Sequence, residues 1–222
     1  MNINNLSNQD TETTEITGVG DFNLSAEQYK SKMQRRKEVQ EKRLQSSIDK
    51  KGLIIVHTGN GKGKTTAALG MVLRSLGHGF RVAIIQFIKG AWDPAEKAIF
   101  TKWENQIEFH AMGEGFTWET QDRNRDIQKA QLAWKTSLNY IRNPDFQLIL
   151  LDEVNVALKL GYLTVDQVLL GLGEKTEDAH IILTGRGAPQ ELIEKADLVT
   201  EMTLIKHPFK SQGVKAQPGI EF

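Results

Sequence analysis

Short apolar runs alternate with longer mixed stretches from about residue 52 onward. The clearest runs lie in GLIIVHTG, RVAIIQFIKG, FQLILLDE and AHIILTGRG, and they are rich in isoleucine, leucine and valine. Such runs are too short for a lone buried helix and are typical of strands covered on both faces of a parallel sheet. IEFHAMG and ADLVTEMTLI are weaker strand candidates.

The stretches between these runs predict helices over 64–77, 94–103, 122–142, 164–172 and 188–195. Alternation of strand and helix predicts an α/β fold, with a mostly parallel sheet that carries helices on both faces. Ligands of such sheets bind beyond the carboxyl ends of the strands. We therefore expect the site near HTGNGKGKTT, QFIKGAW, LLDEVN and LTGRG, which all follow predicted strands.

The first fifty residues lack the alternating apolar runs that mark the rest of the chain. Residues 1–22 are polar and short-sided, which predicts a disordered tail. Residues 23–50 predict a helical arm, with Ser25 as its cap and Gln28 at the position that completes a capping box. This basic helix is either a solvated surface helix or an arm that packs across a partner subunit or over a site. Residues 51–222 would form the main domain.

The overall composition excludes several classes of function. The 28 lysines and arginines balance the 28 aspartates and glutamates, so the chain lacks the basic field that attracts nucleic acid or acidic lipid. It has no cysteine, which excludes disulfides, thiolate metal sites and cysteine nucleophiles. We find no apolar run of about 18 residues, as a membrane span needs, and no secretory signal. We expect a cytoplasmic protein that binds neither nucleic acid nor a membrane.

The segment TGNGKGKTT, residues 58–66, lies where a strand meets a helix. Its Gly63-Lys64-Thr65 ends like the phosphate-binding loop G-x-x-x-x-G-K-[ST], but Thr58 stands where that pattern begins with glycine. Glycine-rich turns let backbone N–H groups face an anion at a helix N-terminus. We predict that Lys64 reaches the phosphates of a nucleotide and that the Thr65 hydroxyl ligates Mg²⁺.

Acidic and basic residues that follow two other strands extend this prediction. LILLDE ends an apolar strand with Asp152 and Glu153, as the Walker B segment of a P-loop NTPase does. One of these two carboxylates would bind Mg²⁺ directly or through its bound water, and in hydrolases the carboxylate that follows it orients the attacking water. Arg186, in TGRG, is either a clamp for phosphate oxygens or a surface arginine. The five histidines are scattered, so we predict no histidine metal site.

The stretch MGEGFTWETQDRNRD fits neither a strand nor a helix interior. Its Phe116 and Trp118 either cap the core or stack on a flat apolar ligand. Over about residues 25–222 the chain resembles the P-loop type of ATP:corrinoid adenosyltransferases. The resemblance is carried by TGNGKGKTTAALG, VAIIQFIKG, GFTWETQ, LDEVN, ILTGRG and the closing KHPFKSQGVKAQPGIEF. It implies a RecA-like P-loop NTPase fold, and the shifted loop is that family's own variant.

The resemblance also implies the reaction. Co(I) of a reduced corrinoid would attack the ribose 5′ carbon of ATP, which lies reversed in the family's loop, and tripolyphosphate would leave. The acceptor would be cobalamin, cobinamide or cobyrinic acid a,c-diamide, in adenosylcobalamin biosynthesis and salvage. Further implications are Mg²⁺ (with Mn²⁺ as a substitute), a reductase that supplies Co(I), and a homodimer in which the N-terminal helix covers the neighbouring subunit's site.

The family's site residues fall on defined positions of this sequence. The resemblance implies ATP binding by Asn60, Gly61, Lys62, Gly63, Lys64, Thr65, Thr66, Arg74 and Arg186. Thr65 and Glu153 would ligate the metal, with Asp152 in the layer behind them. Phe116 and Trp118 would shape the corrinoid site by displacing the lower axial ligand of Co(II), and with Lys64 they are the expected catalytic residues. Val156 stands where many relatives have tyrosine, which puts the corrinoid preference in doubt.

Two other functions stay open on the sequence alone. A RecA-like ATPase would use Glu153 to orient water and would release orthophosphate without any corrinoid. An ATP-dependent corrinoid carrier would bind its ligands without turnover. The shifted loop and the GFTWET segment disfavour the ATPase, and the pairing of Thr65 with Glu153 disfavours the carrier.

Overall fold

The computed structural model describes residues 24–45, 47, 50–88, 95–112 and 122–220, and the chain divides into two compact units, Met1–Asp49 and Lys50–Phe222. The first unit contains α1 (Ala26–Gln45), which has no buried residue. The Ser25 N–H donates to Gln28 Oε1 (2.9 Å) and the Gln28 N–H donates to Ser25 Oγ (3.2 Å), so the predicted capping box is confirmed. The tail predicted for residues 1–22 lies outside the described residues.

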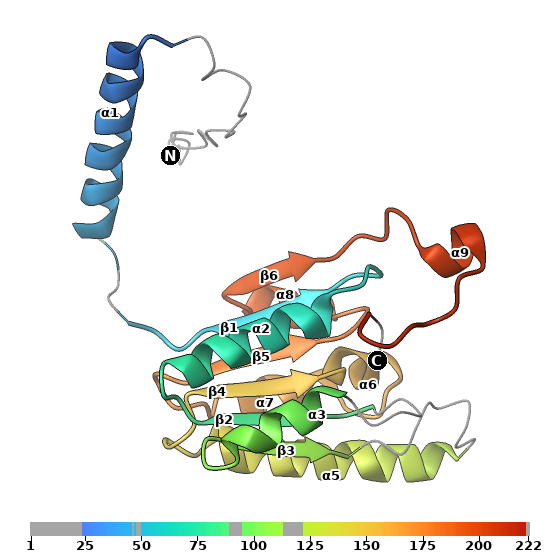
Figure 1. Cartoon of the computed structure of the whole chain (residues 1–222). Coiled ribbons are helices and arrows are strands. Elements are labelled where there is room, and N and C mark those ends of the chain that lie inside the picture. The colour runs from blue at the N-terminus through green and yellow to red at the C-terminus, as the bar shows by residue number, and fades with distance from the viewer. Residues whose placement is uncertain (1–23, 46, 48–49, 89–94, 113–121, 221–222) are drawn as a thin grey trace, which may run out of the picture. The chain divides into compact units, whose positions relative to one another are not determined.

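A parallel sheet forms the centre of the second unit. In the described residues its strands are β1 (Ile54–Thr58), β2 (Val82–Gln86), β3 (Ile107–Ala111), β4 (Leu148–Asp152), β5 (His180–Thr184) and β6 (Leu198–Glu201). Their order is β3-β2-β4-β5-β1-β6, and each pair of neighbours is parallel. All carboxyl ends therefore lie at one edge, toward which the arrowheads point in Figure 1. The predicted sheet is confirmed, including both weaker strand candidates.

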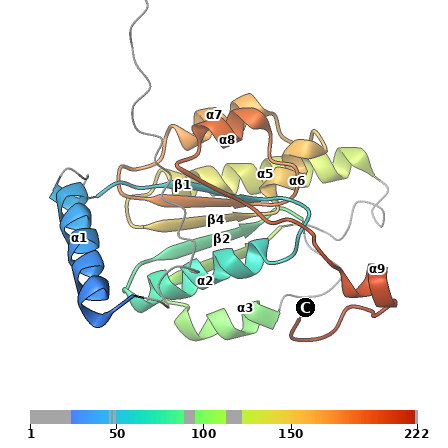
Figure 2. The same cartoon turned by 90° about the horizontal axis from the view of Figure 1, so that it is seen from above.

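Helices cover both faces of this sheet. Those described are α2 (Lys64–Gly77), α3 (Ala95–Phe100), the 3-10 turn η1 (Thr101–Trp103), α5 (Arg123–Ile141), α6 (Val154–Lys159), α7 (Val165–Leu172), α8 (Gln190–Lys195) and α9 (Pro208–Gln212). Figure 2 shows α2 and α3 on one face and α5 to α8 on the other. The predicted α/β layering is confirmed. The helices α6 and α9, of six and five residues, were not predicted from the sequence.

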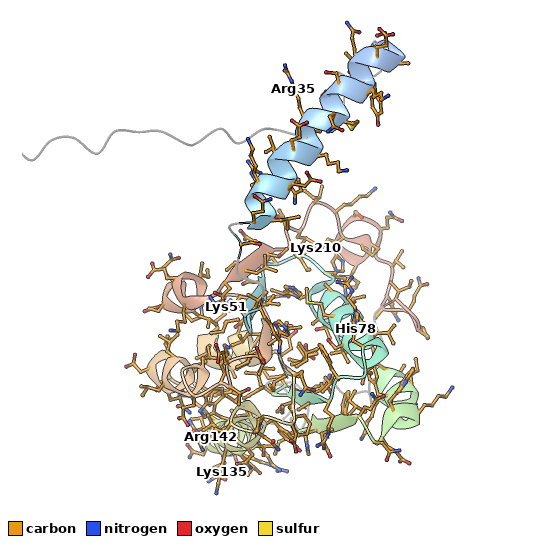
Figure 3. All side chains as sticks on the ribbon, turned by 90° about the vertical axis from the view of Figure 1, so that its left-hand side faces the viewer. Arg35, Lys51, His78, Lys135, Arg142 and Lys210 are labelled. Atoms are coloured by element: carbon orange, nitrogen blue, oxygen red, sulfur yellow. The ribbon has the colours of Figure 1, made fainter. Side chains whose placement is uncertain are left out.

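Two apolar clusters, one on each face, explain why the strands read as continuous apolar runs. Along β4, Ile149 and Leu151 belong to the cluster that includes side chains of α5 to α8. Leu148 and Leu150 belong to the cluster that includes side chains of α2 and α3. A strand buried on both sides needs apolar residues at every position rather than at alternate ones. Figure 3 shows side chains filling the space between sheet and helices. No helix of the described residues is long and apolar enough to cross a membrane.

Candidate functional site

The loop between β1 and α2 lies at the carboxyl edge of the sheet. Gly59 (φ 92°) and Gly63 (φ 103°) adopt left-handed backbone that strains residues with a side chain. Gly61 is required for another reason, because a Cβ there would lie 2.6 Å from the Met202 carbonyl oxygen. The Gly61 N–H donates to that oxygen (2.6 Å), and the Met202 N–H donates to the Thr58 carbonyl (2.9 Å). The loop is therefore held against the residue that follows β6.

Lys64, the first residue of α2, is buried inside the loop, with 6% of its surface exposed. Its Nζ donates to the Gly61 carbonyl oxygen (2.5 Å). Burial lowers the pKa of Lys64, Glu153 opposes that shift, and the like charges of Arg186 and Lys62 add to it. Two cations, Arg186 and Lys62, thus act on Lys64 at a loop of the kind that holds phosphates.

Asp152, the last residue of β4, gathers hydrogen bonds from three segments. Its Oδ1 accepts from the hydroxyls of Thr65 (2.9 Å) and Thr184 (2.7 Å), and its Oδ2 accepts from Gln86 Nε2 (3.1 Å). Burial raises the pKa of Asp152, and these three bonds oppose the shift. The Asp152 carboxylate therefore connects Thr65, in the first turn of α2, to the ends of β2 and β5.

Glu153 has a left-handed backbone conformation and a raised side-chain pKa. Among the described residues it is the only non-glycine with positive φ (59°), a strained conformation of the kind found at functional sites. Its N–H donates to the Thr184 hydroxyl (2.9 Å). Burial and then Asp152 raise the pKa of Glu153 to about 6, while Lys64 and Arg186 act against the rise.

The donor set at this edge fits a magnesium ion held partly by phosphate. Thr65, Asp152 and Glu153 offer a hydroxyl and two carboxylates, which are the oxygen donors that Mg²⁺ prefers. Gln86 Oε1 is buried and has no hydrogen-bond partner in the part of the chain that the structure describes, and such an acceptor suits a metal-bound water. The described residues contain no group of three or more His, Cys, Asp or Glu side chains that could hold a metal ion. Because Mg²⁺ takes an octahedral shell of oxygens, phosphate oxygens and water would complete its ligands beside Thr65 and Glu153.

Residues that brace the loop were missed by sequence reasoning. His57 Nδ1 lies 3.2 Å from the Lys64 carbonyl oxygen, and Asn155 Nδ2 donates to the carbonyl oxygens of His57 (3.4 Å) and Gly185 (3.3 Å). Thr184 and Gln86, which hold Asp152, were missed as well. All four are polar residues within, at the end of, or just after an apolar strand, and that position is the signal that could have identified them.

The structure brings together some of the predicted site residues. Lys64, Thr65, Asp152 and Glu153 meet at the carboxyl edge, and Arg186 acts electrostatically on two of them. Lys62 and Thr66 are exposed in the loop and in the first turn of α2, and Gly63 precedes α2 directly.

The other predicted residues lie elsewhere or outside the described ranges. Arg74 is exposed in the last turn of α2, and helix geometry places it about 15 Å along the axis from Lys64. Its contact with ATP stays a prediction. Val156 is half-buried in α6. Phe116 and Trp118 lie outside the described residues, so their predicted contact with the corrinoid stays a prediction as well.

Known proteins resemble almost the whole chain. Residues 50–222 match the family described as ATP:corrinoid adenosyltransferase BtuR/CobO/CobP, and residues 17–44 match the family described as Cob(I)alamin adenosyltransferase N terminal. The latter match begins before residue 25, where we expected the resemblance to begin.

Several relatives are named corrinoid adenosyltransferase. That of Pseudomonas aeruginosa is 49% identical over 88% of this chain and 96% of its own length. That of Sinorhizobium sp. is 46% identical over 96% and 100% of the two chains. That of Escherichia coli K12 is 39% identical over 90% and 100%.

Proposed function

The chain belongs to the ATP:corrinoid adenosyltransferase family, as a transferase that uses ATP to adenosylate corrinoids, and we propose that the loop between β1 and α2 holds the triphosphate in this reaction. The observation that carries the proposal is the meeting of Lys64, Thr65 and Glu153 at the carboxyl edge of the sheet, around a glycine-rich turn. Helix N-termini after such turns are suited to bind phosphate.

The proposed chemistry needs no base from the protein. The electron pair of Co(I) forms the bond to the ribose 5′ carbon, the bond from that carbon to oxygen breaks, and its electron pair leaves with tripolyphosphate. Co(I) is already a strong nucleophile, unlike a hydroxyl or water that must lose a proton. The protein must therefore stabilise the charge that gathers on the leaving group, and it must align carbon with cobalt.

Lys64 is the main candidate for stabilising that charge. Its ammonium now donates to one neutral carbonyl, that of Gly61. Phosphate oxygens are stronger acceptors for an ammonium than a neutral carbonyl is. On ATP binding, the amine would exchange the Gly61 oxygen for phosphate oxygens and would stay with them as tripolyphosphate departs.

Thr65 and Glu153 would ligate Mg²⁺, for which Mn²⁺ could substitute, and Asp152 would lie behind them. The Thr65 hydroxyl donates a hydrogen bond to Asp152, so the lone pairs of the Thr65 oxygen stay available for the metal. Glu153 would be the second protein ligand, and Asp152 would orient Thr65 from behind. When bound, Mg²⁺ supplies positive charge against the phosphate oxygens.

The remaining parts of the proposal rest on the family resemblance. Phe116 and Trp118 would form the apolar side of the corrinoid site and displace the lower axial ligand of Co(II). A reductase would supply Co(I), α1 would cover the site of the neighbouring subunit in a homodimer, and the enzyme would act in the cytoplasm. An apolar surface suits ligand displacement, because it offers cobalt no nitrogen or oxygen donor.

The proposal is tested by anaerobic incubation of the full chain with Mg-ATP and chemically reduced cob(I)alamin. We expect a light-sensitive adenosylated corrinoid together with tripolyphosphate. Lys64→Ala should lower kcat/KM about 10²–10³-fold, because it removes a charge aimed at the leaving group. Lys135→Ala, an equivalent change on the exposed surface of α5, should have no effect. Orthophosphate with unreacted Co(I) would contradict the proposal and indicate an ATPase.

The role of Trp118 is tested by comparing two cobalt sources. Trp118→Ala should lower turnover most when Co(II) must be reduced on the protein, and less when free Co(I) is supplied. Equal losses with both sources would rule out displacement of the axial ligand by Trp118.

A further inference from the structure

A cavity of about 390 Å³ lies beside the phosphate loop, between the loop and the segment that follows β6. Its lining residues are Asn60, Arg186, Glu201, Thr203, Leu204, His207 and Lys210. The first two belong to the proposed ATP site. The other five belong to the end of β6, the chain that follows it and α9, which contains Lys210. Figure 1 shows α9 at the edge toward which the strands point, and Figure 3 labels Lys210.

The segment beyond β6 is fixed to the loop by backbone contacts. Met202 is hydrogen-bonded through its carbonyl to Gly61 and through its N–H to Thr58. Neither Gly59 nor Gly61 has space for a side chain, since a Cβ at either position would lie 2.5–2.6 Å from the Met202 carbonyl oxygen. The beginning of this segment, at Met202, is therefore held against the loop by contacts within the chain itself.

The chemistry of the lining suits phosphate oxygens. Arg186 and Lys210 are cations. The His207 ring accepts the Phe209 N–H on Nδ1 (3.2 Å), so its neutral form carries hydrogen on Nε2 and can donate. Asn60 and Thr203 add neutral donors. Within the part of the lining that the structure describes, one carboxylate opposes these groups, that of Glu201, whose Cγ packs beside Gly59.

A nucleoside suits the same cavity poorly. Pockets for flat organic ligands are lined mostly by apolar and aromatic side chains. Among the described residues of this lining, Leu204 is the one aliphatic residue and the ring of His207 is the one aromatic surface. The cations and donors outnumber both, so the polyphosphate end of ATP is the better match.

From this lining we infer that Lys210 and His207 form a second wall of the polyphosphate site, which holds the terminal phosphate of ATP and of the departing tripolyphosphate. The inference rests on the proposed function, because it extends the same site. Arg186 would bridge the two walls: it lines the cavity, and it acts electrostatically on Lys64 and Glu153 in the loop. Lys210 would then favour ligands with three phosphates over those with two.

Binding of inorganic tripolyphosphate tests this inference without any corrinoid. Titration calorimetry in Mg²⁺ buffer would compare the wild-type chain with Lys210→Ala, and adenosine would be titrated separately. We expect tripolyphosphate to bind about 10-fold more weakly to the variant, since one charge-assisted contact is lost, with unchanged binding of adenosine. Lys206→Ala is the matched control, because Lys206 is an exposed lysine of the same segment outside the cavity lining. Lys210→Arg should restore most of the affinity.

Two outcomes would overturn the inference. Weaker adenosine binding with unchanged tripolyphosphate binding would make the cavity a nucleoside site. If Lys210→Ala binds both tripolyphosphate and adenosine as wild type does, Lys210 does not contact the polyphosphate. The proposed function is judged separately, because it fails if the wild-type chain makes no adenosylated corrinoid from cob(I)alamin. A wild-type chain that turns over, beside a Lys210→Ala variant with unchanged tripolyphosphate binding, would reject this inference alone.

Discussion

The bodies of the central strands and their last residues have opposite characters. In the bodies, Val56, Ile84, Leu150 and Ile182 are at most 1% exposed and pack against helices. The last residues of these four strands are all polar, namely Thr58, Gln86, Asp152 and Thr184. The same strands therefore provide a core along most of their length and a site at their final position.

Parallel pairing explains how the polar ends meet. Gln86 pairs directly with Asp152 in the register of β2 and β4, and Leu151 pairs with Leu183, which brings Asp152 beside Thr184. The core side chains contribute through the apolar surface that they bury. The end residues contribute through directed hydrogen bonds, so a substitution should affect stability in the bodies and ligand binding at the ends.

The largest effect on stability is expected in a strand body. Leu150→Ala would leave a cavity in the centre of the sheet, where Leu150 is fully buried, and should lower the free energy of unfolding by about 2–5 kcal/mol. Leu170→Ala, on a side chain of α7 that is 73% exposed, should change it by less than about 0.5 kcal/mol. Urea denaturation measures both variants. A decrease of less than about 1 kcal/mol in the free energy of unfolding for Leu150→Ala would contradict the proposed difference between strand bodies and strand ends.

Thr184→Val tests an end residue that serves both fold and site. The variant keeps the shape but leaves the Glu153 N–H and Asp152 Oδ1 each without one partner, which should destabilise the protein by about 1–3 kcal/mol. It should also raise the KM for Mg-ATP, because both acidic residues lose their positioning. Thr200→Val on the exposed surface of β6 is the control for denaturation and kinetics. An unchanged KM would exclude Thr184 from the site.

The strand bodies were predictable from the sequence, whereas the bonds between strand ends were not. An apolar run such as LILL indicates burial on both faces by local pattern alone. The bond between Thr184 and Asp152 depends on which strands are neighbours, and β4 and β5 are separated in sequence by two helices. The loop was predicted because its motif has fixed spacing, and Asp152 and Glu153 were predicted because they directly follow an apolar run. The contact of Met202 with Gly61 has no such spacing, so only the folded chain revealed it.

Glu153→Gln should separate stability from function at one position. In the folded chain the pKa of Glu153 is raised from 4.5 to about 6, so the folded state binds protons more tightly than the unfolded state does. Stability of the metal-free protein should therefore fall as pH rises from about 4.5 to about 6, by at most about 2 kcal/mol.

Neutral glutamine removes this penalty. The variant should be more stable than wild type at pH 7 in chelator, equally stable below pH 4.5, and weaker in Mg-ATP binding. Urea denaturation across this pH range measures the first two effects, with the exposed Glu191→Gln of α8 as control. Equal stability of variant and wild type at pH 7 would show that burying the Glu153 carboxylate does not destabilise the folded protein.

The smallest effect on stability is expected at Gln86, and it isolates the site from the fold. Gln86→Met removes the hydrogen bond to the carboxylate oxygen Oδ2 of Asp152, worth about 1.5–3 kcal/mol. It also removes the buried Oε1, which has no partner among the described residues and whose burial costs a comparable amount, roughly 1–3 kcal/mol. The two effects oppose each other, so the free energy of unfolding should change by less than about 1 kcal/mol. Asp152 would keep its bonds from Thr65 and Thr184. If Oε1 accepts from a metal-bound water, the Mg²⁺ concentration for half-maximal activity should still rise. Loss of stability with unchanged Mg²⁺ dependence would instead make Gln86 part of the fold.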